Sequence, residues 1–505
     1  MTDILKHIAE TVDLLEAIVS NRGLLADMPP ETRQRLLVAA GKVSRPDKAA
    51  RKALHKAQRR KDKVIRRDAE QALLDQTGIR KLRENPIFAT PRRLAAFGQA
   101  APSVASAPSE LGTTRKARTC YVCREPFSTV HWFYDQMCVA CGDLNHAKRT
   151  PSYDLSGRVA LVTGARVKIG YQAAIMLLRN GCSVVCTTRF PRDAASRYAA
   201  EEDFESWRDN LTIYGVDLRH TPSVEALCDK LTAALPRLDF IINNACQTVR
   251  RPPGFYRHLM TAERETAARQ DPVHARLLAD PTAPVFDGSD AAQTALTAER
   301  LLQSGLPAPE MSQIPLVAED LEDGEHLFPT GMLDADRQQV DLRDINSWRL
   351  KLDEVETVEL LEVHLVNAIA PYVINGRLKG LMTRVPSKDK HIVNVSAMEG
   401  QFYRTYKSDR HPHTNMAKAA LNMMTRTSAK DYVEHGIHMN AVDTGWVTDE
   451  DPVALAQQKR DMHRFHPPLD IVDGAARIVD PIFDGLQTGT HLWGQFLKDY
   501  RITDW

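Results

Sequence analysis

The sequence predicts an α/β fold, a doubly wound parallel sheet that follows a helical region and a small cysteine-rich module. Three observations indicate this order. From residue 158 onward, short apolar runs typical of buried parallel strands alternate with helical patterns. Two Cys-x-x-Cys pairs lie shortly before that part of the chain. Residues 1–96 carry apolar side chains at helical spacing.

Composition indicates an ordinary globular protein. The 505 residues, 43% hydrophobic and 26% charged, are enough for about two to four domains. The net charge of +1 gives no overall attraction to nucleic acid or to a membrane. No apolar run reaches about 18 residues, so we expect no membrane span. Acidic residues in the first 20 positions are unlike a signal or transit peptide, which predicts a cytoplasmic protein.

The N-terminal region, residues 1–96, is predicted to be helical and partly basic. Helices are expected over about residues 4–18, 32–41 and 46–74. From Arg45 to Arg67 there are eleven Lys or Arg and only two Asp. The simplest interpretation is a solvated helix face. A contact with RNA or with an acidic partner is the alternative, and the shortage of aromatic residues argues against nucleic acid.

A linker and a metal module are predicted next. Residues 97–118 are small, rich in Pro and Ser, and poorly periodic, as in a linker. In the module at 119–150, each Cys-x-x-Cys aims two thiolates at one ion, and two pairs complete a tetrahedron. We therefore expect a structural zinc site, with a short hairpin through Val130–Tyr134 between the pairs; redox-active pairs are the alternative. The predicted ligands are Cys120, Cys123, Cys138 and Cys141.

Residues 151–505 carry the sheet. Strands are expected at 159–162, 182–187, 211–216, 238–242, 391–396 and 438–442, and helices at 169–180, 223–235, 354–381 and 414–433. The alternation stops at about 248–348, an insert that we expect to form a lid or a protein-contact surface. It begins with Arg250 and Arg251, which suit an anionic substrate or partner. The acidic patch at 319–325 is their simplest partner.

The stretch from Val159 to Gly170 joins the first strand to the first helix through a Thr-Gly turn. Backbone N–H groups and the helix dipole at such a turn point at an anion. The turn therefore predicts a site for the pyrophosphate of a dinucleotide.

With its motifs in this order, the chain resembles the short-chain dehydrogenase/reductase superfamily from about Asp154 to the C-terminus, apart from the insert. The motifs are TGARVKIG in the glycine turn, VDL and NNA after the third and fourth strands, VNAIAP, NVS, MAKAALNMM and DTGWV. The resemblance implies a Rossmann sheet and acid–base catalysis beside a hydride carrier. By position, it implies that Ser396 polarises a carbonyl, Lys418 binds the nicotinamide ribose and Asn367 supports a water relay.

The resemblance also implies which residues contact the cofactor. Asp217 would accept a hydrogen bond from the adenine amino group, and Asn244 and Ala245 would line the adenosine ribose. The full predicted set is Gly164, Arg166, Lys168, Ile169, Gly170, Arg189, Asp217, Leu218, Asn244, Ala245 and Lys418.

Three positions depart from the family pattern. The family has a Tyr four residues before the Lys, and this chain has Thr414, whose hydroxyl is far too weak an acid to replace a phenol. The enlarged loop before it contains Tyr403 and Lys407, which match Y-x-x-x-K but do not continue as a helix. A phenol from this loop is one candidate acid; simple packing of the loop is the alternative. Lys168 replaces the middle glycine of the turn, and Thr444 replaces a Pro.

Arg189 follows the second strand, where an acidic residue would hold the ribose diol of NAD. A guanidinium there suits a 2′-phosphate instead, and Arg166 and Lys168 add positive charge at the same edge. We therefore favour NADP as the cofactor; exposed surface bases are the alternative.

Three functions remain open from the sequence. One is an NADP-dependent oxidoreductase acting on a carbonyl or alcohol whose identity is unknown. The second is a catalytically silent NADP-binding sensor or scaffold, which Thr414 favours. The third, a nucleic-acid-associated protein, rests only on the basic stretch and the zinc module. A protein partner is expected to use the zinc module or the insert, and an oligomer is compatible with the sequence.

Overall fold

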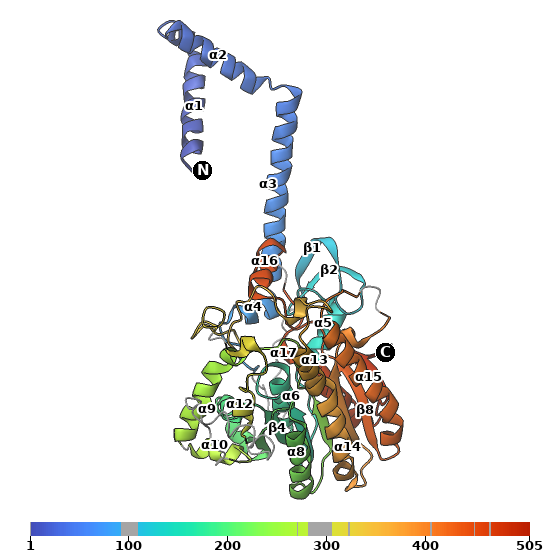
Figure 1. Cartoon of the computed structure of the whole chain (residues 1–505). Coiled ribbons are helices and arrows are strands. Elements are labelled where there is room, and N and C mark those ends of the chain that lie inside the picture. The colour runs from blue at the N-terminus through green and yellow to red at the C-terminus, as the bar shows by residue number, and fades with distance from the viewer. Residues whose placement is uncertain are drawn as a thin grey trace. The chain divides into compact units, whose positions relative to one another are not determined.

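The computed structural model describes residues 2–91, 110–269, 271–280, 306–321, 324–403, 407–448, 450–463 and 466–505. The chain divides into two compact units, Met1–Leu73 and Leu74–Trp505 (Figure 1). In the described residues, the first unit holds helices only, and the second holds both sheets.

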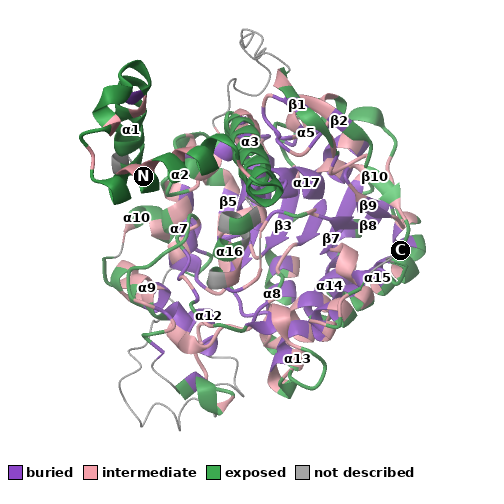
Figure 2. Ribbon diagram, turned by 90° about the horizontal axis from the view of Figure 1, so that it is seen from above, coloured by how far each residue is buried: buried purple, intermediate pink, exposed green. Residues whose placement is uncertain are grey.

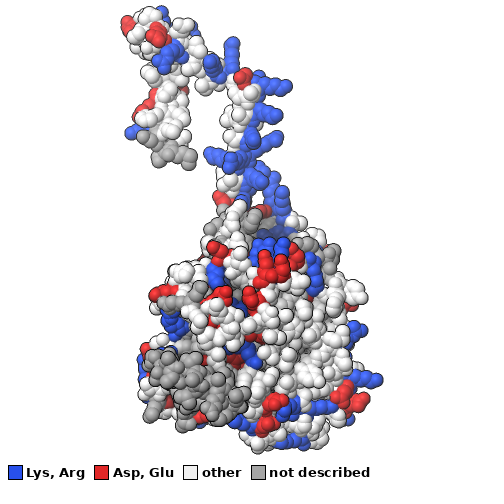
Figure 3. Space-filling model, viewed as in Figure 1, with Lys and Arg blue, Asp and Glu red and all other residues white. Residues whose placement is uncertain are grey.

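The first unit consists of exposed helices, which agrees with the predicted helical N-terminal region. Its elements are α1 (Thr2–Ser20), η1 (Arg22–Leu25), α2 (Pro30–Ser44) and most of α3 (Lys48–Asp75). Apolar side chains of α1 remain open to solvent, with Ile4 66% exposed. The lysines and arginines of the basic stretch are also exposed, and Figure 3 shows them gathered along α3.

The second unit begins with the cysteine module. After α4 (Gly78–Glu84), β1 (Glu110–Thr119) pairs with β2 (Pro126–His131), and α5 (Val139–Lys148) follows. Two boundaries differ from the prediction. Residues 110–118, predicted as linker, form most of β1. The hairpin consists of β1 and β2 and has the first cysteine pair in its turn, whereas it was predicted at Val130–Tyr134. The cause is the β1 sequence, which is mostly polar and largely exposed, so it carries no apolar alternation.

The module is packed into the main core; residues 97–109 of the predicted linker lie outside the described residues. Phe127, Phe133 and Tyr134 belong to the same buried cluster as the helices on one face of the large sheet. Arg149 at the end of α5 pairs with Asp470 and Asp473, each at 2.8 Å. Both carboxylates lie at the start of α17 (Ile471–Thr488), where Asp470 is the N-cap.

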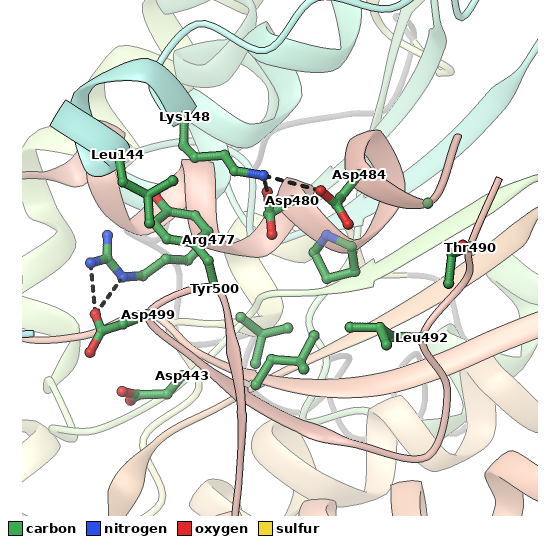
Figure 4. A pocket seen from close by; sticks show the side chains of 14 residues that line it. Leu144, Lys148, Asp443, Arg477, Asp480, Asp484, Thr490, Leu492, Asp499 and Tyr500 are labelled. Carbon is green, nitrogen blue, oxygen red and sulfur yellow. Dashed lines mark hydrogen bonds and ion pairs between the residues drawn. The ribbon is translucent and has the colours of Figure 1, made fainter. Parts of the chain in front are cut away.

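A second set of contacts joins the same two helices (Figure 4). Lys148 of α5 lies 2.5 Å from Asp480 and 3.4 Å from Asp484. Arg477 of α17 pairs with Asp499 at 2.8 Å and donates to Asn145 of α5 at 2.7 Å. The Arg477–Asp499 pair is buried, so removing one of its partners would leave a buried charge alone.

The large sheet has eight strands in the order β10-β9-β8-β7-β6-β3-β4-β5. The strands are β3 (Val159–Thr163), β4 (Ser183–Thr188), β5 (Leu211–Gly215), β6 (Phe240–Asn243), β7 (Lys390–Ser396), β8 (Ile437–Asp443), β9 (Phe496–Lys498) and β10 (Arg501–Thr503). All pairs are parallel except β9 with β10. Strand β3 lies between β4 and β6, so the direction of winding reverses beside it. The predicted doubly wound Rossmann sheet is confirmed.

Helices cover both faces of this sheet (Figure 2). One core cluster holds side chains of α6 and α17 together with the module, and a second holds side chains of α8, α14 and α15. The main helices are α6 (Lys168–Leu178), α7 (Pro191–Ala199), α8 (Thr221–Ala234), α13 (Thr357–His364), α14 (Ala370–Thr383), α15 (Pro412–Val433) and α16 (Val453–His463). Short turns are η2 (Phe204–Ser206), η3 (Arg208–Asn210) and η8 (Met398–Gly400).

The predicted helix at 354–381 is interrupted by a π-helical turn, η7 (Leu365–Ile369). The whole stretch Thr357–Thr383 is long and apolar enough to cross a membrane by length and composition, although the sequence showed no such run. In the structure it packs against α8 and α15, and Ile374 and Leu378 are fully buried in the sheet core. Part of its apolar surface is therefore buried within the protein.

The insert packs beside β5, the edge strand of the sheet, where Leu278 forms a bridge with Ile213. Its described elements are η4 (Pro253–Tyr256), α9 (Arg257–Arg269), α10 (Pro272–Leu277), α12 (Ala308–Met311), η5 (Ala318–Leu321) and η6 (Ser347–Arg349). Phe255, Tyr256 and Phe328 form a small core with Phe190, which precedes α7. Part of the predicted acidic patch, residues 322–323, lies outside the described residues.

Candidate dinucleotide-binding cleft

A cavity of about 1000 Å³ lies at the carboxyl ends of the parallel strands. Every residue predicted to contact the cofactor lines it, from the glycine turn at Gly164 to Lys418 on α15. Ser396 and Thr414 line it as well, whereas Asn367 does not. The volume suits a ligand of dinucleotide size.

The glycine turn lies very close to the residues of the NNA motif. Gly164 has φ of +66°, and a Cβ there would lie 2.8 Å from Cα of Ala245. A Cβ on Gly170 would lie 2.2 Å from Nδ2 of Asn244. That amide donates to the carbonyl oxygens of Thr163 and Gly164 at 3.0 and 3.1 Å. The NNA motif is therefore hydrogen-bonded directly to the turn. Only glycine fits at positions 164 and 170.

Lys168 stands at the N-terminus of α6, where the family has glycine. Its φ is +56°, in the left-handed region that an L-residue adopts at a cost. Burial opposes its charge, but the nearby carboxylates of Glu450 and Asp336 outweigh burial and raise the pKa of Lys168. The side chain therefore remains an ammonium group at the edge where the pyrophosphate is predicted to bind.

Arg166 is already engaged within the protein. It pairs with Asp193 of α7 at 2.7 Å and donates to the side chain of Gln338 at 2.5 Å. Burial lowers the pKa of Arg166 despite Asp193. Because Gln338 belongs to the insert, Arg166 connects the glycine turn to the segment that covers it.

Arg189 is placed differently. It follows β4, is half-buried, and donates to the hydroxyl of Tyr256 at 2.8 Å, with its guanidinium 4.6 Å from that ring. In the described part of the chain, no carboxylate lies within ion-pair distance of Arg189. The insert thus supports a cationic group in the cleft wall without neutralising it, which is the arrangement a phosphate requires.

Asp217 is held by a neighbouring arginine. Arg219 donates to it at 2.7 Å and also pairs with Glu362 at 2.7 Å. Burial works against the charged form of Asp217, but Arg219 and Arg189 lower its pKa. The carboxylate therefore stays ionised, as an acceptor for an adenine amino group must.

The predicted catalytic residues are all engaged in internal hydrogen bonds. Ser396, the last residue of β7, donates to Oδ1 of Asn422 at 2.6 Å. Lys418 donates to the carbonyl oxygen of Val395 at 2.8 Å. Asn367, in the π-helical turn, exchanges two hydrogen bonds with the backbone of Gln247, at 2.7 and 2.9 Å. Ser396 and Lys418 remain at the cavity wall, and Asn367 is held away from it.

No phenol replaces the family tyrosine in the described residues. Thr414 is only 2% exposed, and its hydroxyl has no hydrogen-bond partner in the described structure. Tyr403 of the enlarged loop is 90% exposed, so it faces solvent. Tyr406 lies outside the described residues. The tyrosines that line the cavity are Tyr121 and Tyr256.

The arginines at the start of the insert bind within the protein. Arg250 pairs with Asp320 at 2.6 Å, inside the predicted acidic patch. Arg251 pairs with Asp341. Arg250 is therefore neutralised by the insert, and Arg251 contributes to the cavity wall as one half of an ion pair.

Sequence reasoning missed the contribution of the cysteine module to this cavity. Thr119, Tyr121, Arg124 and Gln136 line it, next to Trp446 of the loop after β8. The contact joins positions more than 300 residues apart, so no local pattern signals it. The only sequence cue is Tyr121 itself, an aromatic residue between the first two cysteines. The four cysteines do come together, with their sulfur atoms all within 4.8 Å of one another.

Comparisons with known proteins agree with this geometry. Two family models match successive parts of the chain, short chain dehydrogenase over residues 158–263 and enoyl-(acyl carrier protein) reductase over residues 349–469. Residues 264–348 of the insert fall between them. The fold defines an α/β protein of Rossmann type. The chain is a divergent member of the short-chain dehydrogenase/reductase superfamily.

Individual relatives cover very different shares of the chain. An uncharacterized protein of Acanthamoeba polyphaga mimivirus is 29% identical over 396 residues, 76% of this chain and 75% of that protein. This share exceeds residues 151–505, so the likeness extends to residues before the Rossmann domain. Dehydrogenase/reductase SDR family member 13 of Bos taurus is 35% identical over 102 residues, only 19% of this chain and 27% of that protein.

Among solved structures, the NADPH-bound carbonyl reductase from chicken fatty liver is 19% identical, with a TM-score of 0.39. The alignment covers 70% of this chain and 100% of that one.

Proposed function

We propose that this protein binds NADP(H) in the cleft and acts as an oxidoreductase on a carbonyl or alcohol. The observation that carries the cofactor choice is Arg189, a half-buried guanidinium in the cleft wall that is held by the Tyr256 hydroxyl and has no carboxylate partner in the described residues. Its position after β4 is where the adenosine ribose would lie in a sheet of this type. A 2′-phosphate there would take up the unused donors.

Different residues of the cleft would hold different parts of the cofactor. The glycine turn and Lys168 would hold the pyrophosphate, the first by N–H groups and the second by charge. Lys418 would donate to the nicotinamide ribose with the N–H bonds that Val395 leaves free. When bound, the nicotinamide supplies or accepts a hydride. The insert would exclude water above the glycine turn, through the bond from Arg166 to Gln338.

A second candidate is a nucleotide-bound sensor or scaffold without turnover, and one observation favours it. The position that carries the family phenol is Thr414, buried and unable to deliver a proton at neutral pH. The hydroxyl of Ser396 is also directed to Asn422, so polarising a carbonyl would require breaking that bond first. Reduction in this cleft would then need a proton from water or from a side chain that the family does not use.

Fluorescence titration of the full-length protein with NADPH tests binding, and NADPH oxidation against a panel of aldehydes and ketones tests turnover. We expect saturable binding of NADPH. Turnover above the rate of buffer alone supports the oxidoreductase, and tight binding without turnover across the panel supports the sensor. Absence of any dinucleotide binding would contradict both.

A further inference from the structure

The geometry points to a second function for the cysteine module: Cys120, Cys123, Cys138 and Cys141 bind one zinc ion, and this metal site orders the loop that walls the dinucleotide cleft. The loop is defined here as residues 443–448, which begin with the last residue of β8. The metal site stands on the sulfur geometry alone. The expected effect of the metal site on nucleotide affinity rests on the proposed function, whereas its effect on the loop does not.

The sulfur atoms have the spacing of a tetrahedral metal site. All four thiols are free, and they lie within 4.8 Å of one another. The Sγ atoms of Cys123 and Cys138 are 3.8 Å apart. Zinc–sulfur bonds of about 2.3 Å at tetrahedral angles place two sulfurs about 3.8 Å apart, so the pair already has the expected edge length. Four thiolates leave no position for a substrate or water, which makes the site structural.

The surroundings complete such a site without adding further ligands. Cys120 and Cys141 are buried, and the backbone N–H of Cys138 donates to the sulfur of Cys120 at 3.4 Å. His131, a histidine of the same module, is engaged in other contacts. Its Nδ1 accepts from the N–H groups of Phe133 and Tyr134 at 3.0 and 3.1 Å.

One residue connects this site to the cleft. Tyr121 lies between the first two cysteines, lines the cavity, and accepts a hydrogen bond from the backbone N–H of Trp446 at 2.9 Å. Gly445 allows this approach, since its φ is +76° and a Cβ there would lie 3.1 Å from the Tyr121 hydroxyl and 2.4 Å from Leu469. The phenol of the metal knuckle therefore holds the backbone of the loop directly.

A second contact supports the same loop. Lys498 of β9 pairs with Asp443, the first residue of the loop, at 2.8 Å, and its ammonium lies 5.7 Å from the centre of the Tyr121 ring. The other end of the module is anchored independently by Arg149 on Asp470 and Asp473. Loss of metal would thus free the knuckle and its tyrosine while α5 stays docked.

The metal is tested on the purified full-length protein by elemental analysis. We expect one zinc per chain, and loss of that zinc in Cys138→Ser. Protein purified with iron in this position, or with no metal, would overturn the zinc assignment. Zinc retained at full stoichiometry in Cys138→Ser would overturn the ligand set.

The effect on the loop is tested with Tyr121→Phe, which removes only the phenol oxygen and leaves all four cysteines. Tyr372→Phe, at a position that is 67% exposed, is the matched control. Hydrogen exchange of a peptide covering residues 443–448 reports the Trp446 N–H without any nucleotide. We expect exchange at least about fivefold faster in Tyr121→Phe and in zinc-stripped protein, with zinc retained in the former and no change in the control. Equal exchange in Tyr121→Phe and wild type would overturn the coupling.

NADPH affinity gives a separate readout. A Kd about fivefold weaker in Tyr121→Phe than in Tyr372→Phe is expected, the size of one lost hydrogen bond. If wild-type protein holds zinc and protects the loop but binds no NADPH, the proposed function fails and the metal-ordered loop stands.

Discussion

The hydroxyl of Ser396 donates a hydrogen bond of 2.6 Å to the side-chain oxygen of Asn422, one helical turn beyond Lys418 on α15. A serine that polarises a carbonyl must direct its proton into the cavity, and here the proton is directed at a neighbouring amide. The cleft therefore combines intact residues for holding a dinucleotide with reduced means of moving a proton. The following predictions separate these two properties.

Restoring the phenol should raise turnover. Thr414→Tyr places a phenol four residues before Lys418, on a side that lines a cavity of about 1000 Å³. A positioned acid of suitable pKa contributes about 10²-fold or more to proton transfer. We expect NADPH oxidation with an aldehyde to rise by at least about tenfold, measured by the loss of nicotinamide absorbance.

Thr414→Phe is the matched control, because it adds the same ring without the hydroxyl. Equal rates in the Tyr and Phe variants, both folded by circular dichroism, would show that no proton is delivered from position 414.

Lys168 should assist NADPH binding through its charge and not through its backbone conformation. Lys168→Gly keeps the positive φ at no steric cost, so the fold should be retained. Loss of the ammonium should weaken NADPH binding about fivefold, the equivalent of roughly 1 kcal/mol for one lost polar contact. Isothermal titration at low and high salt measures this, with Lys168→Arg as the charge-preserving control. An unchanged Kd in Lys168→Gly would mean that the side chain points away from the pyrophosphate.

A buried carboxyl in the insert should make stability depend on pH. Glu263 of α9 is fully buried, and burial raises its pKa to about 8 although it accepts from the N–H of Asp193 at 2.9 Å. The folded state therefore favours the neutral acid. Its stabilising contribution is complete below the unfolded pKa of about 4.3 and is lost as the pH rises to about 8.

Glu263→Gln keeps the acceptor and removes the titration. We expect the Tm of Glu263→Gln to exceed that of wild type by a margin that grows between pH 5 and pH 8 and then levels off. The corresponding difference in unfolding free energy is on the order of a few kcal/mol. Glu265→Gln, exposed on the same helix, should show no such trend. A difference in Tm that does not vary with pH would contradict the raised pKa.

Breaking the anchor of the cysteine module should destabilise the whole second unit. Arg149→Met leaves the buried carboxylates of Asp470 and Asp473 without their cation. We expect a loss of about 3–5 kcal/mol in unfolding free energy, measured by urea denaturation. Arg124→Met, in the same module and without a carboxylate partner in the described residues, should cost far less. Similar losses in both variants would argue that the Arg149 network adds no stability.

The residues proposed to bind the cofactor could be brought together from sequence because they follow the ends of parallel strands. Gly164, Asp217 and Asn244 each lie just beyond the end of a parallel strand, and parallel strands bring such positions to one edge. The environment of each charge could not be predicted. That Arg166 is used by Asp193 and Gln338, while Arg189 is not neutralised, depends on how the insert packs.

In the cysteine module, a local spacing could be predicted from the sequence, but contacts between distant segments could not. The spacing of its four cysteines is a local pattern, and it correctly indicated that the four sulfur atoms come together. The pairing of β1 with β2 was not predicted, because β1 is mostly polar and exposed, and the contact of Tyr121 with Trp446 depends on the docking of two distant segments. Helix α17 was also missing from the expected helices, although its capping box at Asp470 is a local signal in the sequence.

The central claim, an NADP(H) site in which Arg189 holds the 2′-phosphate, is tested most directly by the ratio of the NADH and NADPH dissociation constants in wild type and in Arg189→Ala. Arg501→Ala, exposed on β10, is the control. The account predicts a wild-type Kd for NADPH at least about tenfold below that for NADH, and a ratio near one in Arg189→Ala with NADH affinity unchanged. Equal affinities for the two cofactors in wild type, or a preference that survives in Arg189→Ala, would contradict it.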